Sequence, residues 1–135
     1  MLKLVALCAL FAVSFAGHAS AQTSPAASLV TIQSSASTNA FSLKAAQGHL
    51  YGFSLCNTSG TAKFFKFYNK ATAPVVGTDV VAFKVMLPAN SCRDRAYTLG
   101  TNFTLGIAWA ITGGAADSDT TAVAAGDVVG ALDHK

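Results

Sequence analysis

Oxygen-bearing side chains gather near the C-terminal end of the chain, in GGAADSDTTAVAAGDV (113–128). Asp117, Asp119 and Asp127 could supply carboxylate ligands to Ca²⁺, which takes about six to eight oxygen atoms. The Asp-x-Asp spacing is a weak signal, because no Glu occupies the last ligand position of an EF-hand loop. Asx turns in a solvated loop explain the same residues. The sequence therefore favours a polar loop and leaves Ca²⁺ as a weak alternative.

Aromatic and basic side chains alternate in AKFFKFYN (62–69). Because successive side chains of a strand point to opposite faces, Phe64, Lys66 and Tyr68 share one face and two further phenylalanines share the other. Both faces are then aromatic, whereas a strand with one solvated face alternates cleanly. Three explanations stay open for the face bearing Phe64, Lys66 and Tyr68. Another part of the chain covers it, a second copy packs on it, or it is a stacking platform for a glycan or a base.

Catalytic signatures are missing from the sequence. No G-x-S-x-G motif accompanies the histidines, and no acidic pair resembles that of a glycosidase. His49 and His134 have no ligand spacing relative to the cysteines, so no zinc site is predicted. Arg93-Asp94-Arg95 favours a surface charge cluster, with contact to a carboxylate or a sugar as the alternative. We expect a protein without enzymatic activity, and a small hydrolase is the minor alternative.

The N-terminal segment predicts export. A short positive start, MLK, precedes the apolar run LVALCALFAVSFA and a small-residue cleavage site at Ala19-Ser20-Ala21. The run is shorter than the roughly 20 residues that a membrane-spanning helix needs. A cleaved signal peptide over 1–21 is therefore favoured over an uncleaved anchor, and contact with a membrane is expected only during export. A flexible lead-in (22–28) and one domain (29–135) follow.

Cysteine and charge counts describe the exported chain. Export leaves Cys56 and Cys92, which in an oxidising compartment most simply form one disulfide, with free thiols or an intermolecular bridge as alternatives. On a chain-entropy argument this bridge stabilises the fold by roughly 3–4 kcal/mol.

The charge of the exported chain is close to neutral. Without Lys3 the nine basic residues become eight against six acidic ones. This near-neutral balance gives no case for nucleic-acid binding.

Short runs of β-branched and aromatic residues, separated by turn residues, predict a sheet protein. The expected strands are 29–33, 41–45, 49–57, 63–69, 81–87, 91–98 (a strand or a loop), 103–112 and 128–132. The tight turn NTSG (57–60) predicts a hairpin between the third and fourth strands. This pattern favours a single all-β domain, an antiparallel β-sandwich of jelly-roll type with seven or eight strands and one disulfide.

Two stretches carry a resemblance to a known group. They are LKAAQGHLYGFSLCNTSGTAKFFKFYNKATAPVVGTDVVAFKVMLP and LGTNFTLGIAWAITGGAADSDTTAVAAGDVVGAL. Together they resemble small β-sandwich proteins of tailed phages and prophages, which are virion-associated or of unknown function. The resemblance implies a virion-like structural role and no catalytic residues. The signal peptide and the cysteine pair depart from that group, so an exported relative in the periplasm, at the cell surface or outside the cell is an equal reading.

These observations lead to two hypotheses of different class. The first is a non-enzymatic, exported structural or assembly protein, virion-like or on the cell surface, that associates with copies of itself. The second is a secreted carbohydrate-binding module that holds a glycan on Phe64, Lys66 and Tyr68. A homo-oligomer is expected in the first case, and a glycan-bound monomer in the second.

Overall fold

A computed structural model describes residues 27–135, which form eight β-strands and, within this range, no helix. The strands are β1 (Ser28–Gln33), β2 (Phe41–Lys44), β3 (Gly48–Asn57), β4 (Lys63–Asn69), β5 (Phe83–Leu87), β6 (Ser91–Phe103), β7 (Ile107–Thr112) and β8 (Val128–His134). The predicted signal peptide (1–21) and most of the predicted lead-in (22–28) lie outside the described residues. No helix within residues 27–135 has the length and apolar character needed to span a membrane.

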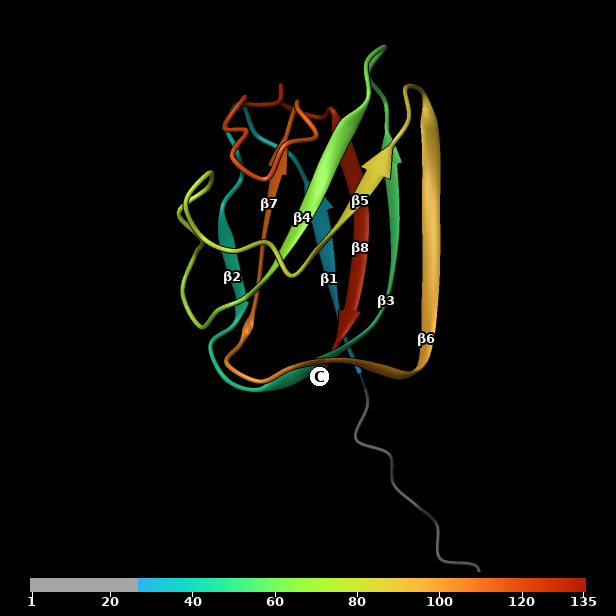
Figure 1. The fold of residues 1–135 in the computed structure, drawn as a ribbon. Helices are drawn as coiled ribbons and strands as arrows, with labels where there is room; N and C mark the ends of the chain where they lie inside the picture. Colours follow the sequence, from blue (N-terminus) through green and yellow to red (C-terminus); the bar gives the residue numbers. More distant parts are fainter. Residues whose placement is uncertain (1–26) are drawn as a thin grey trace, which may run out of the picture.

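The strands form two four-stranded antiparallel sheets that pack face to face (Figure 1). Sheet A has the order β1-β8-β3-β6, and sheet B has the order β2-β7-β4-β5. Pairing is nested from the two ends of the chain inward, as β1 with β8, β2 with β7, β3 with β6, and β4 with β5. This nesting is the connectivity of a jelly roll, so the predicted fold class is confirmed.

Aromatic rings fill the space between the sheets, because the inward faces of both sheets carry large apolar side chains. The ring centroids of Phe67 and Phe83 are 4.6 Å apart, and those of Phe65 and Trp109 are 5.0 Å apart. The other large buried core side chains are Ile32, Leu50, Phe53, Leu55, Leu87, Phe103, Ile107, Ile111, Val128 and Leu132. One continuous core therefore fixes both sheets.

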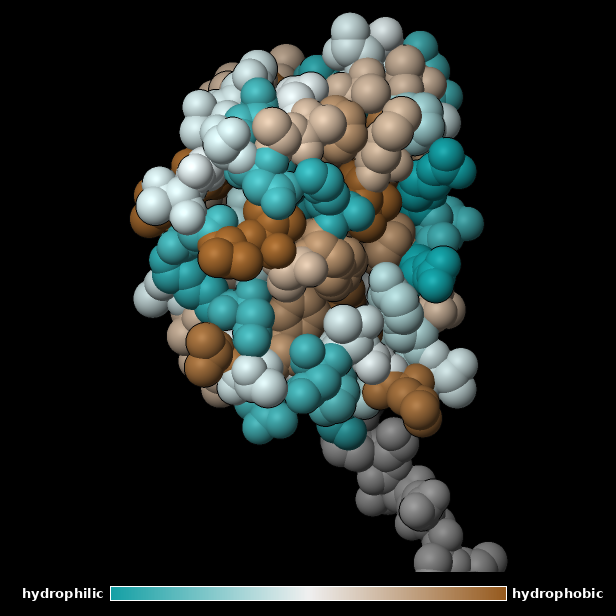
Figure 2. Space-filling model, viewed as in Figure 1, coloured by the Kyte–Doolittle hydropathy of each residue, from teal (hydrophilic) through white to brown (hydrophobic). Residues whose placement is uncertain are grey.

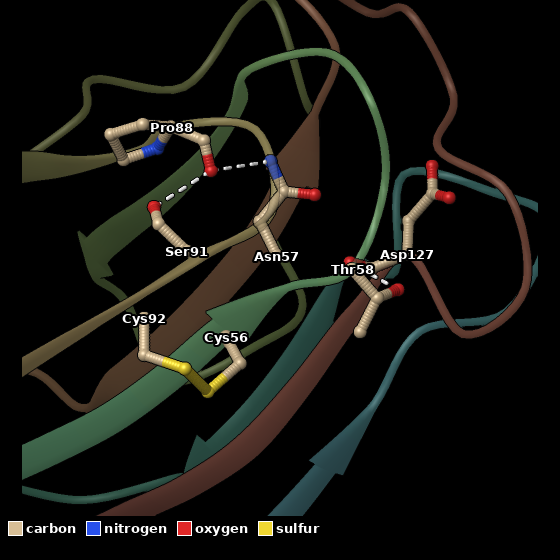
Figure 3. The surroundings of a disulfide bond; sticks show 7 residues. All are labelled: Cys56, Asn57, Thr58, Pro88, Ser91, Cys92 and Asp127. Atoms are coloured by element: carbon tan, nitrogen blue, oxygen red, sulfur yellow. Dashed lines mark hydrogen bonds between the residues drawn. A yellow bond between two sulfur atoms is a disulfide. The ribbon is translucent and has the colours of Figure 1, made fainter.

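The disulfide prediction is confirmed. Cys56 on β3 and Cys92 on β6 lie directly opposite each other in the ladder and are bonded (Figure 3). Their neighbour Leu55 points into the core, so the two cysteines lie on the outer face of sheet A. The bond ties the start of the edge strand β6 to the central strand β3.

The predicted hairpin between 49–57 and 63–69 is wrong. β3 belongs to sheet A and β4 to sheet B, and the two strands do not pair. The cause is Asn57, whose side chain is buried and bonds to the carbonyls of Leu87 and Pro88 in the turn between β5 and β6. These bonds draw the chain across the end of the sandwich into the other sheet.

The predicted single strand 103–112 is also two elements. β6 ends at Phe103 and β7 begins at Ile107, with the exposed Leu105 between them. The chain crosses between the sheets at Gly106, which has φ of 158°. A Cβ at this position would lie 2.6 Å from the Lys44 carbonyl oxygen, so only glycine allows this close approach of two main chains.

Candidate functional site

The chain itself covers the outer face of sheet B over the central strands β4 and β7. Lys66 and Tyr68 are 0% and 1% exposed. Tyr68 packs against Ala108, Ala110, and two valines of the loop between β4 and β5. These side chains are therefore not available as a stacking platform or as an assembly face. Coverage by the same chain therefore accounts for Lys66 and Tyr68, whereas Phe64 on the same face is half-buried.

Two lysines hold the acidic loop between β7 and β8 against sheet B. Lys66 on β4 and Lys84 on β5 lie directly opposite each other on the outer face. The Lys66 ammonium donates to the carbonyls of Ala116 at 2.7 Å and Asp119 at 3.1 Å. Burial lowers the pKa of Lys66, and the carboxylates of Asp119 and Asp117 offset part of this effect. The buried ammonium is thus satisfied by main-chain oxygens, as a buried charge must be.

Asp117 and Asp119 have separate partners within this loop. The Lys84 ammonium donates to Asp117 at 2.7 Å, and this bond lowers the pKa of Asp117. Burial raises the pKa of Asp119, but hydrogen bonds from Thr121 and from the Gly114 N–H outweigh it and leave the pKa below its usual value. Both residues therefore shape the loop.

Asp127 lies apart from the other two aspartates. It accepts a hydrogen bond from the Ala124 N–H at 2.9 Å, which lowers its pKa, and it forms an ion pair with Lys63 at 3.1 Å. Within residues 27–135 no group of three histidine, cysteine or acidic side chains is placed to hold a metal ion. The structure therefore gives the suggested Ca²⁺ site at Asp117, Asp119 and Asp127 no support.

Replacing Lys66 with methionine is expected to loosen this loop. Methionine fills the apolar part of the site but leaves three carbonyl oxygens without a donor, and we expect a loss of about 1–2 kcal/mol in the free energy of unfolding. Hydrogen exchange should speed up first at amides of 113–121. The matched Lys44→Met variant should leave the loop unchanged, and equal exchange in both variants would refute the role of Lys66.

Acid is expected to destabilise the fold. Like the three aspartates above, Asp79 has a lowered pKa, because Lys70 and the Val75 N–H donate to it. Because the pKa values of these carboxyl groups are lower in the folded state than in the unfolded chain, the folded state binds fewer protons near pH 4. The free energy of unfolding therefore falls as the pH drops below about 5. Thermal unfolding between pH 7 and pH 3 measures this effect. The profile should be flatter in Asp127→Asn, and a flat profile in the unchanged protein would contradict the prediction.

Sequence reasoning missed a cleft of about 460 Å³ between β5 and β6, the edge strands of the two sheets. Its lining residues are Phe53, Phe83, Lys84, Val85, Met86, Arg93, Asp94, Arg95 and Tyr97. In Figure 1 these strands form one side of the sandwich, and Figure 2 shows apolar surface beside strongly hydrophilic side chains there. The cleft therefore combines an apolar floor with charged walls.

The arginines of this cleft lie on the inward face of β6. Arg93 is directly opposite Leu55 and Arg95 is directly opposite Phe53, and both of these β3 residues belong to the core. Opposite residues of a ladder share a face, so both guanidinium groups are carried on the core side of sheet A. The Arg95 guanidinium carbon lies 5.5 Å from the centre of the Tyr97 ring, within cation–π range.

The alternation Arg93, Arg95, Tyr97 was the signal available in the sequence. It has the period of a strand, but charged residues do not by themselves indicate which face is inward. The sequence reading placed these arginines in a surface cluster. In the structure Arg93, Asp94 and Arg95 are exposed, as a surface cluster would be, and they also line the cleft.

No protein-family model and no curated protein matches this chain. Among solved structures, the chain is similar to the coat protein of Tobacco streak virus, at 13% identity. The match covers 78% of this chain and 84% of that chain, with a TM-score of 0.36. This is a distant likeness of fold.

Proposed function

We propose that this protein is a non-enzymatic, exported structural protein that assembles with copies of itself through the outer face of sheet A. The two outer faces differ in a way that supports the proposal. The loops between β4 and β5 and between β7 and β8 cover sheet B over β4 and β7, and leave Met86 on the edge strand β5 exposed (Figure 1). Sheet A carries exposed or half-exposed side chains on its outer face.

The register shows that short side chains make up much of this outer face. One row across the four strands consists of Thr31, Ala131, Ser54 and Asp94, and the next consists of Gln33, Val129, Cys56 and Cys92. Nearly all of these side chains are short, and only Asp94 carries a charge. Two sheets pack about 10 Å apart when side chains between them interdigitate, and short side chains allow that approach. The uncovered face with its short side chains is the observation that carries the proposal.

The test is the oligomeric state of the protein purified after export from cells that express the full chain. Sedimentation over a range of concentrations should show dimers or larger species. Thr31→Lys combined with Ala131→Lys places two charges side by side on this face, one on the edge strand β1 and one on its neighbour β8, and should give a monomer with unchanged sheet content. Thr72→Lys, on the exposed loop over sheet B, should assemble as the unchanged protein does.

Two results would count against this function. The first is a monomer at every concentration up to the millimolar range. The second is an oligomer that survives Thr31→Lys with Ala131→Lys, because the contact would then lie elsewhere. Recovery of the intact signal peptide on the mature protein would remove the exported part of the proposal and leave the assembly part standing.

A further inference from the structure

We propose that the cleft between β5 and β6 binds an acidic, extended peptide segment of a partner protein, which adds as a strand to the free edge of β6. This surface adjoins the outer face of sheet A at Asp94, which ends one row of that face and also lines the cleft. The proposal goes beyond self-assembly, because it assigns the protein a second partner of different chemistry.

The main chain of β6 supplies the first argument. β6 spans 13 residues and ends the order of sheet A, so it pairs only with β3. An edge strand presents a row of unpaired N–H and C=O groups, which is the template for strand addition by a peptide. Residues 92–96 of this strand are all exposed. Nothing in the described part of the chain occupies this edge.

Charge spacing supplies the second argument. Arg93 and Arg95 lie two residues apart on one face, and therefore about 7 Å apart along the strand. An added peptide strand has the same repeat, so carboxylates at alternate positions would face both guanidinium groups. Each pair can form charge-assisted, bidentate hydrogen bonds. Lys84 lines the same cleft from β5, but its ammonium is already paired with Asp117 at 2.7 Å, so the two arginines are the cations that this argument uses. Asp94 also lines the cleft, but it is opposite Ser54 and therefore lies on the other face of β6 from Arg93 and Arg95.

The same charges argue against a second copy of β6 as the occupant. Two antiparallel copies related by a twofold axis match residues on the same face of the joined sheet. Registers centred on this segment then place Arg93 opposite Arg93, Arg95 or Tyr97 of the other copy. When Arg93 is opposite Arg93 or Arg95, like charges face each other directly. When Arg93 is opposite Tyr97, Arg95 is opposite Arg95, so every one of these registers is destabilised by like charges. An acidic strand relieves this repulsion.

A peptide with alternating glutamate and threonine tests the proposal. Fluorescence anisotropy would measure its binding to the protein purified after export. Two control peptides have the same length. In the first, glutamine replaces every glutamate, and in the second the same residues are arranged as a block of glutamate followed by a block of threonine. We expect the alternating peptide to bind at least about tenfold more tightly than either control, a difference of about 1.4 kcal/mol.

Variants of matched charge separate the cleft from a general attraction. Arg93→Gln with Arg95→Gln should weaken binding at least about tenfold, whereas Lys44→Gln with Lys135→Gln should change it less than about twofold. Amides of 91–99 should gain protection from hydrogen exchange when the alternating peptide binds. Circular dichroism would confirm that both double variants keep the fold.

Several outcomes would overturn the proposal. Equal weakening by the two double variants, or equal binding of the block peptide, would reduce the effect to net charge. No binding at millimolar peptide would leave the arginines as guards against edge-to-edge aggregation. Tighter binding of an oligogalacturonate of equal charge would assign the cleft to an acidic glycan. An oligomer that dissociates in Arg93→Gln with Arg95→Gln would assign the cleft to a second copy.

Discussion

Replacing Asn57 with alanine is expected to lower the free energy of unfolding by about 3 kcal/mol. The side chain is 2% exposed. Its Nδ2 donates to the carbonyls of Thr61 at 2.8 Å, Leu87 at 2.9 Å and Pro88 at 3.1 Å. Its Oδ1 accepts from the N–H and the hydroxyl of Ser59. One amide thus joins the turn after β3 to the turn before β6, as Figure 3 shows for Pro88.

Alanine would leave these groups without partners at a site that solvent reaches poorly, and an unsatisfied buried polar group costs about 1–3 kcal/mol. Asn57→Asp keeps the shape and the acceptor but replaces the donor by an oxygen that faces carbonyl oxygens. We expect it to be at least as destabilising at neutral pH. Urea unfolding with the disulfide intact measures both variants.

Asn102→Ala is the matched control, because Asn102 is exposed and its closest side-chain partner, Gln47, is 3.5 Å away. This variant should change stability by less than about 0.5 kcal/mol. If Asn57→Ala were as stable as Asn102→Ala, the hydrogen bonds of Asn57 across the end of the sandwich would contribute nothing to the free energy of unfolding.

Asn57 also explains why the topology could be predicted only in part. The period-two alternation along β5 gave the strand and its inward face, and two cysteines in an exported chain gave the disulfide. The turn NTSG has the composition of a hairpin, yet two of the partners of Asn57, Leu87 and Pro88, lie about 30 residues away in the sequence. A local pattern does not contain such partners, so the connection between sheets was read as a pairing within one sheet.

Lys66 shows the same limit for the candidate site. Lysine is almost never fully buried, so the residue type alone left open whether the chain, a second copy or a ligand covers this face. The carbonyl oxygens that satisfy its ammonium come from residues 50 to 53 positions later in the chain. The arginines of β6 are the reverse case, because the core pattern predicts apolar side chains where the strand carries charges. In both cases the deviation from residue-type expectation marks a part of the fold that depends on long-range contacts.

Gly130→Ala is expected to be the most damaging single substitution, with a loss of about 3–5 kcal/mol in the free energy of unfolding. Gly130 lies within β8, paired with Ile32 of β1 on one side and Leu55 of β3 on the other. Its φ is 150°, a conformation that other residues adopt only with strain. A Cβ there would lie 2.0 Å from the Ser54 carbonyl oxygen and 2.9 Å from the Leu55 Cα.

Relief of this clash would require β8 to move away from β3, because both atoms in the way belong to the main chain.

Two other glycines separate the cost of the clash from the cost of the backbone conformation. Gly126 has φ of 77° and open space around its Cβ position, so Gly126→Ala should show only the conformational cost of about 1 kcal/mol. Gly60 has open space and no positive φ, so Gly60→Ala should be nearly neutral. Because all three changes add one methyl group, the difference between Gly130→Ala and Gly126→Ala in urea unfolding measures how closely β8 and β3 must approach. Equal values would mean that the two strands separate without cost, which the packed core beneath Leu55 and Leu132 makes unfavourable.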